Sequence, residues 1–137
     1  MPEVSQVAGS LSTPCRTALL MGMWILFDGG FVSIVAHREN KALLCVRGRA
    51  LGDVEAFCKR SAIADPEGII ETPDADYRFR VVLDRGIVTA AVAEIVASMD
   101  YDNFKTRVAR SQGSERANVY HDVWEDLLAL DTRHGER

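Results

Sequence analysis

The residues best spaced for ligand chemistry are four arginines in two short alternating segments. In Tyr77–Leu83 and in Leu43–Arg49, side chains two positions apart share one face of a strand, so the arginines lie together on one side. If the two strands are neighbours in register, the four guanidinium groups form one surface that attracts anions, with a histidine at its margin. The predicted binding residues are Arg47, Arg49, Arg78, Arg80 and His37.

This arginine face, defined by the four arginines, allows two interpretations. It could bind a phosphate group, a nucleotide or the carboxylates of an acidic protein partner. It could also be an ordinary solvated sheet face, on which arginines pair with nearby acids. Charge reversal at Arg78 and Arg80 together distinguishes them, because only the first interpretation predicts a loss of binding.

A second candidate cluster joins a polar segment to the last predicted helix. Its acid, amide, amine and imidazole groups could position a substrate and move a proton, provided the fold brings them within hydrogen-bond reach. The alternative is structural, because Asp and Asn are also good N-terminal residues for the following helix. The cluster consists of Tyr101, Asp102, Asn103, Lys105 and His121.

Known catalytic and cofactor motifs are absent from the 137 residues. There is no glycine-rich phosphate loop, no His-Glu-x-x-His pair and no Gly-x-Ser-x-Gly elbow. The three cysteines, Cys15, Cys45 and Cys58, form no C-x-x-C pair and have no zinc-ligand spacing. We therefore predict no metal and no cofactor, and we leave open whether the protein is an enzyme. The odd cysteine count favours a reducing compartment, the cytoplasm, with Cys45 and Cys58 buried.

The charge balance limits the choice of partners. A net charge of −4 argues against a general attraction to nucleic acid or to anionic lipid. Residues 31–60 nevertheless carry three more basic than acidic residues, while residues 115–137 carry three more acidic than basic ones. The longest apolar run, Ala18–Phe27, is far shorter than the ~20 residues that span a bilayer. The sequence thus predicts no membrane insertion.

The order of the predicted elements indicates an α+β fold. Strands are expected over residues 24–27, 31–37, 43–49, 69–72 and 77–83, with a helix from Asp53 to Arg60 between the third and fourth. Helices follow over about 87–99, from Asp102 or Asp100 to about 110, and over 114–130. Because strands and helices do not alternate regularly, we predict an antiparallel sheet of four to five strands. The helices should pack mainly on one face, and the C-terminal third should be helical.

Domain boundaries follow from the same patterns. Residues 1–22 lack periodicity and are predicted to be a loose tail or to precede the true start, with Met21 and Met23 as alternative start sites. Residues 23–131 form one predicted α+β domain, and 132–137 a loose end. The apolar stripe of the last helix is wide, which predicts contact with both the sheet and a neighbouring helix, or with a second subunit in a homodimer.

Several stretches resemble a widespread family of small uncharacterised bacterial proteins. The resemblance spans about residues 23–130 and implies a bacterial cytoplasmic protein, but it supplies no activity. Members of that family begin near the Met-Trp pair, which agrees with a start at Met23. The stretches that carry the resemblance are Met23–Phe27, Gly30–Val35, Ala75–Arg80, Asp100–Lys105 and Tyr120–Trp124.

Three functional hypotheses remain. The leading hypothesis is a non-enzymatic binding or interaction module, dimeric and using the arginine face. The second is a small enzyme acting on an anionic metabolite, with Asp102, Lys105 or His121 transferring a proton. The third and weakest is binding of single-stranded nucleic acid, which needs exposed aromatic rings on the sheet face. Tyr77 and Phe79 are predicted to point to the opposite, core side, which counts against it.

Overall fold

The computed structural model describes residues 21–61 and 66–135. Contacts divide this part of the chain into two units, where the sequence predicts one domain. The first unit contains 21–26, 30–61 and 66–99, and the second contains 27–29 and 100–135. The predicted tail over residues 1–22 lies almost entirely outside the described residues.

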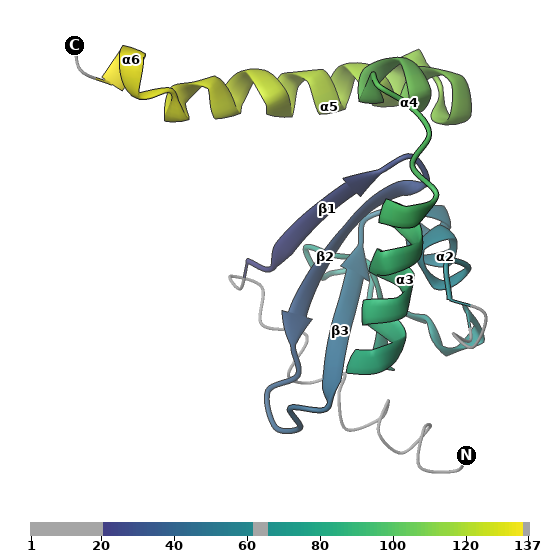
Figure 1. The fold of residues 1–137 in the computed structure, drawn as a ribbon. Coiled ribbons are helices and arrows are strands. Elements are labelled where there is room, and N and C mark those ends of the chain that lie inside the picture. The colour runs from purple at the N-terminus through teal and green to yellow at the C-terminus, as the bar shows by residue number, and fades with distance from the viewer. Residues whose placement is uncertain (1–20, 62–65, 136–137) are drawn as a thin grey trace. The chain divides into compact units, whose positions relative to one another are not determined.

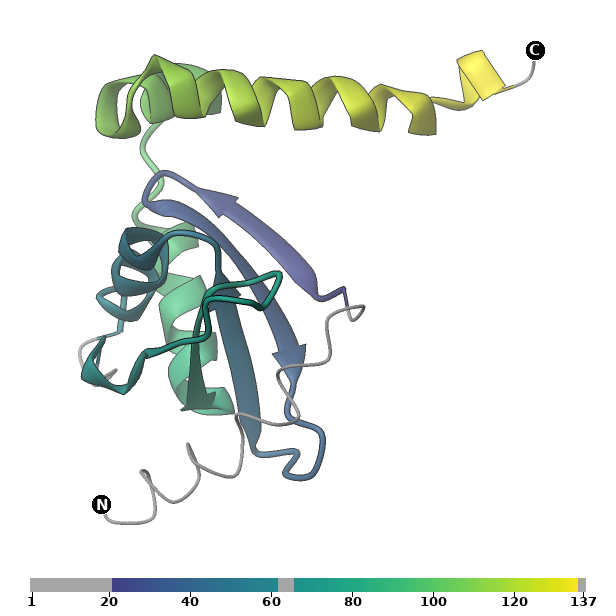
Figure 2. The same cartoon turned by 180° about the vertical axis from the view of Figure 1, so that it is seen from behind.

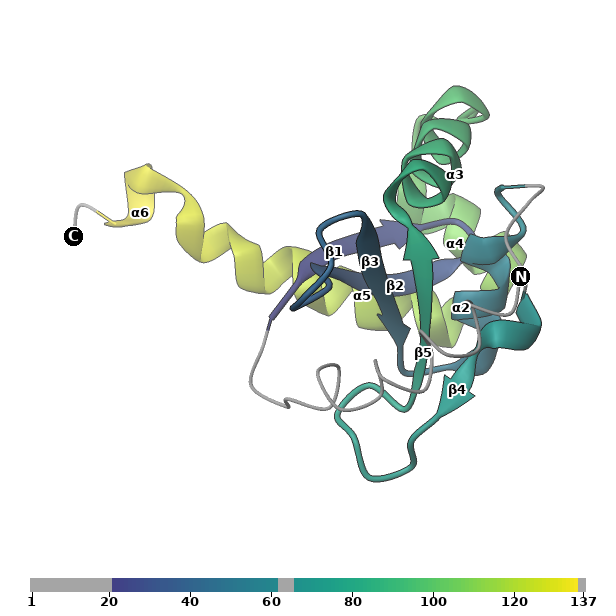
Figure 3. The ribbon, with the colours of Figure 1, turned by 90° about the horizontal axis from the view of Figure 1, so that it is seen from below.

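The first unit is built on a five-stranded antiparallel sheet with the strand order β1-β2-β3-β5-β4. Figure 1 labels its first three strands, and Figure 3 labels all of them. A two-residue turn joins β1 to β2 and a six-residue loop, 37–42, joins β2 to β3, because polar residues interrupt the apolar runs there. The three successive strands that the sequence predicts at the start are confirmed. The strands are β1 (Met23–Phe27), β2 (Gly30–Ala36), β3 (Leu43–Gly48), β4 (Ile70–Glu71) and β5 (Phe79–Asp84).

Two helices pack against this sheet. α2 (Leu51–Cys58) contacts β2, β3 and β5, and the view from behind in Figure 2 shows it beside the central strands. α3 (Arg85–Ala97) continues directly from β5, as Figure 3 shows. A Cβ atom on Gly48 would lie 2.6 Å from Val54 of α2, so α2 covers the sheet face to which Gly48 belongs. A short 3-10 turn, η2 (Pro66–Gly68), precedes β4.

The start of α2 differs from the prediction. The N-cap residue is Ala50, and Asp53 lies inside the first turn instead of capping the helix. Asp53 is buried, and its carboxylate accepts a hydrogen bond of 3.0 Å from the backbone N–H of Phe31. A side chain that sequence alone marks as a helix cap therefore fixes the start of β2.

The second unit contains two consecutive helices and a short end. α4 (Phe104–Gln112) and α5 (Ser114–Leu127) are separated by Gly113, whose φ of 100° suits glycine. η3 (Leu128–Leu130) and α6 (Thr132–Gly135) follow. The break is thus narrower than the predicted Ser111–Gly113, Ser114 begins α5 instead of capping it, and the expected loose end includes a helical turn.

These elements confirm the predicted fold class, an α+β fold with an antiparallel sheet and a helical C-terminal third. Within residues 21–61 and 66–135, no helix is both long enough and apolar enough to cross a membrane. Cys45 and Cys58 are both buried, as predicted.

Candidate functional site

The arginine-bearing strands are neighbours in register, which is the condition that the sequence argument requires. β3 and β5 are antiparallel neighbours, and Arg47 lies directly opposite Arg80. In the same register, Gly48 pairs with Phe79 and Val46 with Val81, which places those residues on the α2 side. Arg47 and Arg80 therefore share the other face of the sheet.

The accessibility of these two arginines corrects the prediction of an exposed arginine face. Arg47 is only 1% exposed and Arg80 only 2%. Arg47 Nη2 donates to Ser33 Oγ at 2.8 Å, and Arg80 Nη2 donates to the carbonyl oxygen of Tyr77 at 2.8 Å. Both guanidinium groups are thus part of the protein interior and cannot belong to a surface open to solvent.

The other two arginines are exposed but lie outside the strands. Arg78 precedes β5 and forms a 2.7 Å ion pair with Glu71. Both of these side chains are about half exposed. Arg49 follows β3 and donates from Nε to the carbonyl oxygen of Asp76 at 3.2 Å. Its guanidinium carbon lies 4.5 Å from the centroid of the Tyr77 ring. The four arginines therefore do not make one surface.

His37 stabilises the connection between β2 and β3. Its Nδ1 accepts hydrogen bonds from the backbone N–H groups of Glu39, at 3.1 Å, and Asn40, at 2.9 Å. Because Nδ1 accepts both, the proton of the neutral ring lies on Nε2. The residue is buried, and within the described residues its Nε2 has no hydrogen-bond partner.

An aromatic cluster is centred on Tyr77, whose ring contacts Arg49. Tyr77 lies on the arginine side, because its ring centroid is 4.5 Å from the guanidinium carbons of both Arg47 and Arg49. The prediction that it points to the α2 side is wrong. Trp24 Nε1 donates to Tyr77 Oη at 3.1 Å, and Phe31 packs edge-on against Trp24 with centroids 5.6 Å apart. We call Trp24, Phe31, Tyr77 and Arg49 the Trp24–Arg49 surface.

Trp24 and Phe31 are not among the site residues predicted from the sequence. Both lie in the hairpin of β1 and β2, and Trp24 remains 43% exposed although it is a large apolar side chain. The only signal in the sequence was the residue type of Trp24, since aromatic rings with a polar tip are enriched where a protein binds its partners.

The second candidate cluster does not assemble a proton-transfer site. Asp102 and Lys105 are exposed, and His121 Nε2 lies 3.7 Å from Glu125 Oε2 one turn further along α5. In the described ranges, no hydrogen bond or ion pair joins Asp102, Lys105 or His121 to one another. Tyr101 packs against Phe104, with ring centroids 5.9 Å apart.

Asn103 has the structural role that the sequence offers as the alternative. Its Oδ1 accepts a 3.0 Å hydrogen bond from the backbone N–H of Thr106 and so caps α4. Replacing Asn103 with alanine should lower the free energy of unfolding by about 1 kcal/mol. Urea denaturation followed by circular dichroism measures this loss. Asp102→Ala, at an exposed neighbour, should change stability by less than about 0.5 kcal/mol, and equal losses would contradict the capping role.

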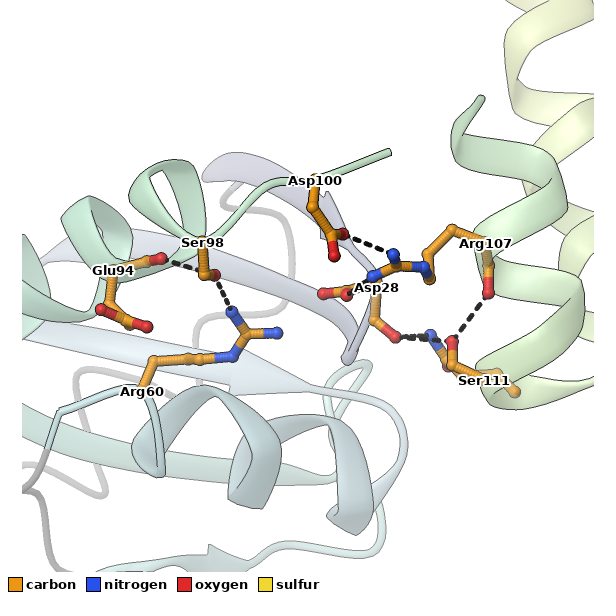
Figure 4. A network of polar contacts seen from close by, with 8 residues as sticks. Asp28, Arg60, Glu94, Ser98, Asp100, Arg107 and Ser111 are labelled. Atoms are coloured by element: carbon orange, nitrogen blue, oxygen red, sulfur yellow. Dashed lines mark hydrogen bonds and ion pairs between the residues drawn. The ribbon is translucent and has the colours of Figure 1, made fainter. Parts of the chain in front are cut away.

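A polar network in the second unit was not predicted. Arg107 donates from Nη1 to Asp28 at 3.0 Å and from Nη2 to Asp100, as drawn in Figure 4. The carbonyl oxygen of Asp28 accepts from Ser111 Oγ at 3.0 Å and from Gln112 Nε2 at 2.9 Å. Donation to Asp100, and secondly to Asp28, raises the pKa of Arg107, so this guanidinium stays charged. Its charge is used internally, to hold residues 27–29 against α4.

Neither a metal site nor a similar known protein narrows the choice of function. Among the described residues, no group of three or more His, Cys, Asp and Glu side chains is placed to hold a metal ion. No protein-family model, curated protein or solved structure matches this chain. The candidate site therefore depends on its own geometry alone.

Proposed function

We propose that the protein is a non-enzymatic binding module whose ligand is a small anion with an aromatic or other apolar part. The proposed site is the Trp24–Arg49 surface. The observation that carries the proposal is Arg49, an exposed guanidinium that has no carboxylate partner in the part of the chain that the structure describes. An exposed arginine that is already held in place can bind a carboxylate or phosphate with little further loss of side-chain freedom.

Two contacts hold Arg49 in position. Stacking over Tyr77 orients the guanidinium plane, and donation from Nε to Asp76 fixes its direction. Arg78 is also an exposed arginine, but Glu71 already neutralises its charge. An anion would therefore be expected to select Arg49 over Arg78.

The apolar part of the ligand is suggested by Trp24. Its indole ring is partly exposed and is oriented by its hydrogen bond to the same Tyr77 that supports Arg49. A ring on the ligand could pack on Trp24 while its anionic group contacts Arg49. Such a combination of one apolar surface and one charged donor is typical of small-molecule sites.

The alternative functions receive less support from the same contacts. Proton transfer needs convergent groups, and Asp102, Lys105 and His121 do not contact one another within the described ranges. Binding of single-stranded nucleic acid needs several rings open to bases, whereas Tyr77 is buried and only Trp24 is exposed among the aromatic residues at this surface. Buried Cys45 and Cys58 agree with the cytoplasmic location that we propose.

The test uses phenyl phosphate as the probe and Trp24 as the reporter. The chain has two tryptophans, so Trp124→Phe leaves Trp24 as the only one. Titration should change Trp24 emission with saturation, and Arg49→Gln should weaken binding at least about tenfold, the effect of losing one charged hydrogen bond. Arg78→Gln should leave the affinity unchanged.

Two outcomes would count against the proposal. Equal affinity in the Arg49→Gln and unaltered chains would remove Arg49 from the site, and no saturable change would remove the site itself. Release of phenol during the titration would show catalysis and would favour the enzyme hypothesis. Inorganic phosphate should bind more weakly than phenyl phosphate, because it has no ring to contact Trp24.

A further inference from the structure

The 37–42 loop folds around an unprotonated nitrogen of a buried ring. Nδ1 of His37 accepts from the backbone N–H groups of Glu39 and Asn40. Two backbone hydrogen bonds complete the loop, because the N–H of Leu43 donates to the carbonyl oxygen of Asn40 at 3.0 Å and that of His37 donates to Leu43 at 3.1 Å. His37 is only 7% exposed. We call the loop with these four hydrogen bonds the closed 37–42 loop.

A second proton on the ring removes the acceptor on which the closed loop depends. A neutral imidazole has one N–H group and one acceptor nitrogen, whereas an imidazolium has N–H groups on both nitrogens and accepts no hydrogen bond. Protonation of His37 therefore breaks its bonds to Glu39 and Asn40 and directs an N–H group at theirs. The closed loop and a charged His37 exclude each other.

The surroundings of the ring offer little compensation for a positive charge. Nε2 is buried without a hydrogen-bond partner in the part of the chain that the structure describes, and no carboxylate there forms an ion pair with His37. β1, on the other side of β2, has no charged side chain. The charged groups of the loop and of the junction between β5 and α3 are all exposed, so water screens them. They are Arg38, Glu39, Lys41, Asp84 and Arg85.

We propose that the 37–42 loop is a proton-operated switch, which is closed while His37 is neutral and opens when acid protonates the ring. The closed loop binds the neutral form, so closure is complete at high pH and is lost as the pH falls. Histidine ordinarily titrates near physiological pH, so a mildly acidic medium suffices. The inference does not depend on the Trp24–Arg49 surface.

Opening of the loop also reaches the start of α3. The backbone N–H of Arg85, the first residue of that helix, donates to the carbonyl oxygen of Ala42 at 2.8 Å. Its Nε and Nη2 donate to the carbonyl oxygen of Lys41 at 3.0 Å and 2.8 Å. One residue thus ties α3 to the loop by three hydrogen bonds, and acid loosens the junction of β5 and α3 together with the hairpin.

The test is hydrogen exchange of the full chain, followed by NMR at about pH 8 and at about pH 5. Dividing each rate by that of an unfolded peptide at the same pH leaves only the protection that structure provides. Protection of the Asn40 amide should fall at least about tenfold in acid, because its acceptor is lost. Protection of Val46, a buried residue in the middle of β3, should stay unchanged, since the switch is local.

His37→Asn separates protonation from other effects of acid. Oδ1 of asparagine can take the place of Nδ1, accepts hydrogen bonds from amides two and three residues further along, and does not titrate. Its loop should stay protected at both pH values. His121→Asn is the matched control, because His121 is an exposed histidine of α5, and this variant should keep the response of the unaltered chain.

The unaltered chain supplies a second measurement that needs no variant. The carbon-bound protons of the His37 ring report its protonation, and their titration should coincide with the loss of protection at Asn40. A ring that titrates while Asn40 stays protected would overturn the proposal. So would an equal loss of protection in His37→Asn, or a parallel loss at Val46, which would mean that acid unfolds the whole sheet.

Discussion

Truncating Arg80 to alanine should lower the free energy of unfolding by about 3 kcal/mol, whereas Arg78→Ala should cost less than about 1 kcal/mol. The two arginines are separated by one residue, but Arg80 is 2% exposed and Arg78 is about half exposed. Removing Arg80 leaves a void in the interior and breaks its 2.8 Å hydrogen bond to Tyr77. Removing Arg78 breaks only an exposed ion pair with Glu71.

Chemical denaturation of both variants against the unaltered chain measures the difference. Equal, small losses would mean that Arg80 is accessible to solvent and would restore the exposed arginine face. Arg78→Ala is also a functional control. A ligand that requires the arginine face should bind this variant more weakly, whereas a ligand bound at the Trp24–Arg49 surface should bind it with unchanged affinity.

The two-residue alternation of the strands was enough to predict which side chains share a face of the sheet, but the pairing of the two arginine-bearing strands entered only as a condition. The alternation correctly placed Arg47 and Arg80 on one face, and the structure pairs them directly. Alternation assigns a side chain to a face but does not reveal whether that face is covered. The neighbouring positions Ser33 and Cys45 are uncharged and fully buried, and such residues on the second face of a central strand are the sequence sign of burial on both sides.

Alternation also fails beyond the ends of a strand. The prediction for Tyr77 assumed that β5 begins there, but the strand begins at Phe79. Tyr77 lies outside the hydrogen-bonded part of β5. Its contacts with Trp24, Arg47 and Arg49 therefore determine on which face of the sheet its side chain lies. The candidate site thus depends on a residue whose orientation no periodicity could give.

The helices show the same limit at a larger scale. The 3.6-residue period predicted a wide apolar stripe in the last helix, and the stripe is present. How much of it is covered depends on where α4 ends, and a cap such as Asn103 or Gly113 fixes an end only to within a few residues when read from sequence. The exposure of Trp124 and Leu127 therefore required the structure.

Gly30→Ala should lower the free energy of unfolding by about 3 kcal/mol, because two costs coincide at this position. Gly30 has a φ of +154°, in the region that favours glycine, and an added Cβ would lie 2.5 Å from Cγ of Asp53. The methyl group must displace the carboxylate that accepts from the N–H of Phe31. Strain in the backbone is thus added to the loss of a buried hydrogen bond.

A double-mutant cycle with Asp53→Ala separates the two costs. Asp53→Ala alone should cost about 2 kcal/mol by leaving the N–H of Phe31 without its acceptor. The double variant loses the hydrogen bond only once and keeps the backbone strain, so the combined loss should fall short of additivity by about 2 kcal/mol. Simple additivity would show that the two residues do not contact each other.

Gly86→Ala is the matched control, because no atom lies within 4 Å of its added Cβ in α3. Alanine should raise the free energy of unfolding there by about 0.5–1 kcal/mol. The same methyl group is added at both glycines. A loss of stability at Gly30 and a gain at Gly86 would therefore show that the loss at Gly30 comes from its backbone conformation and from Asp53.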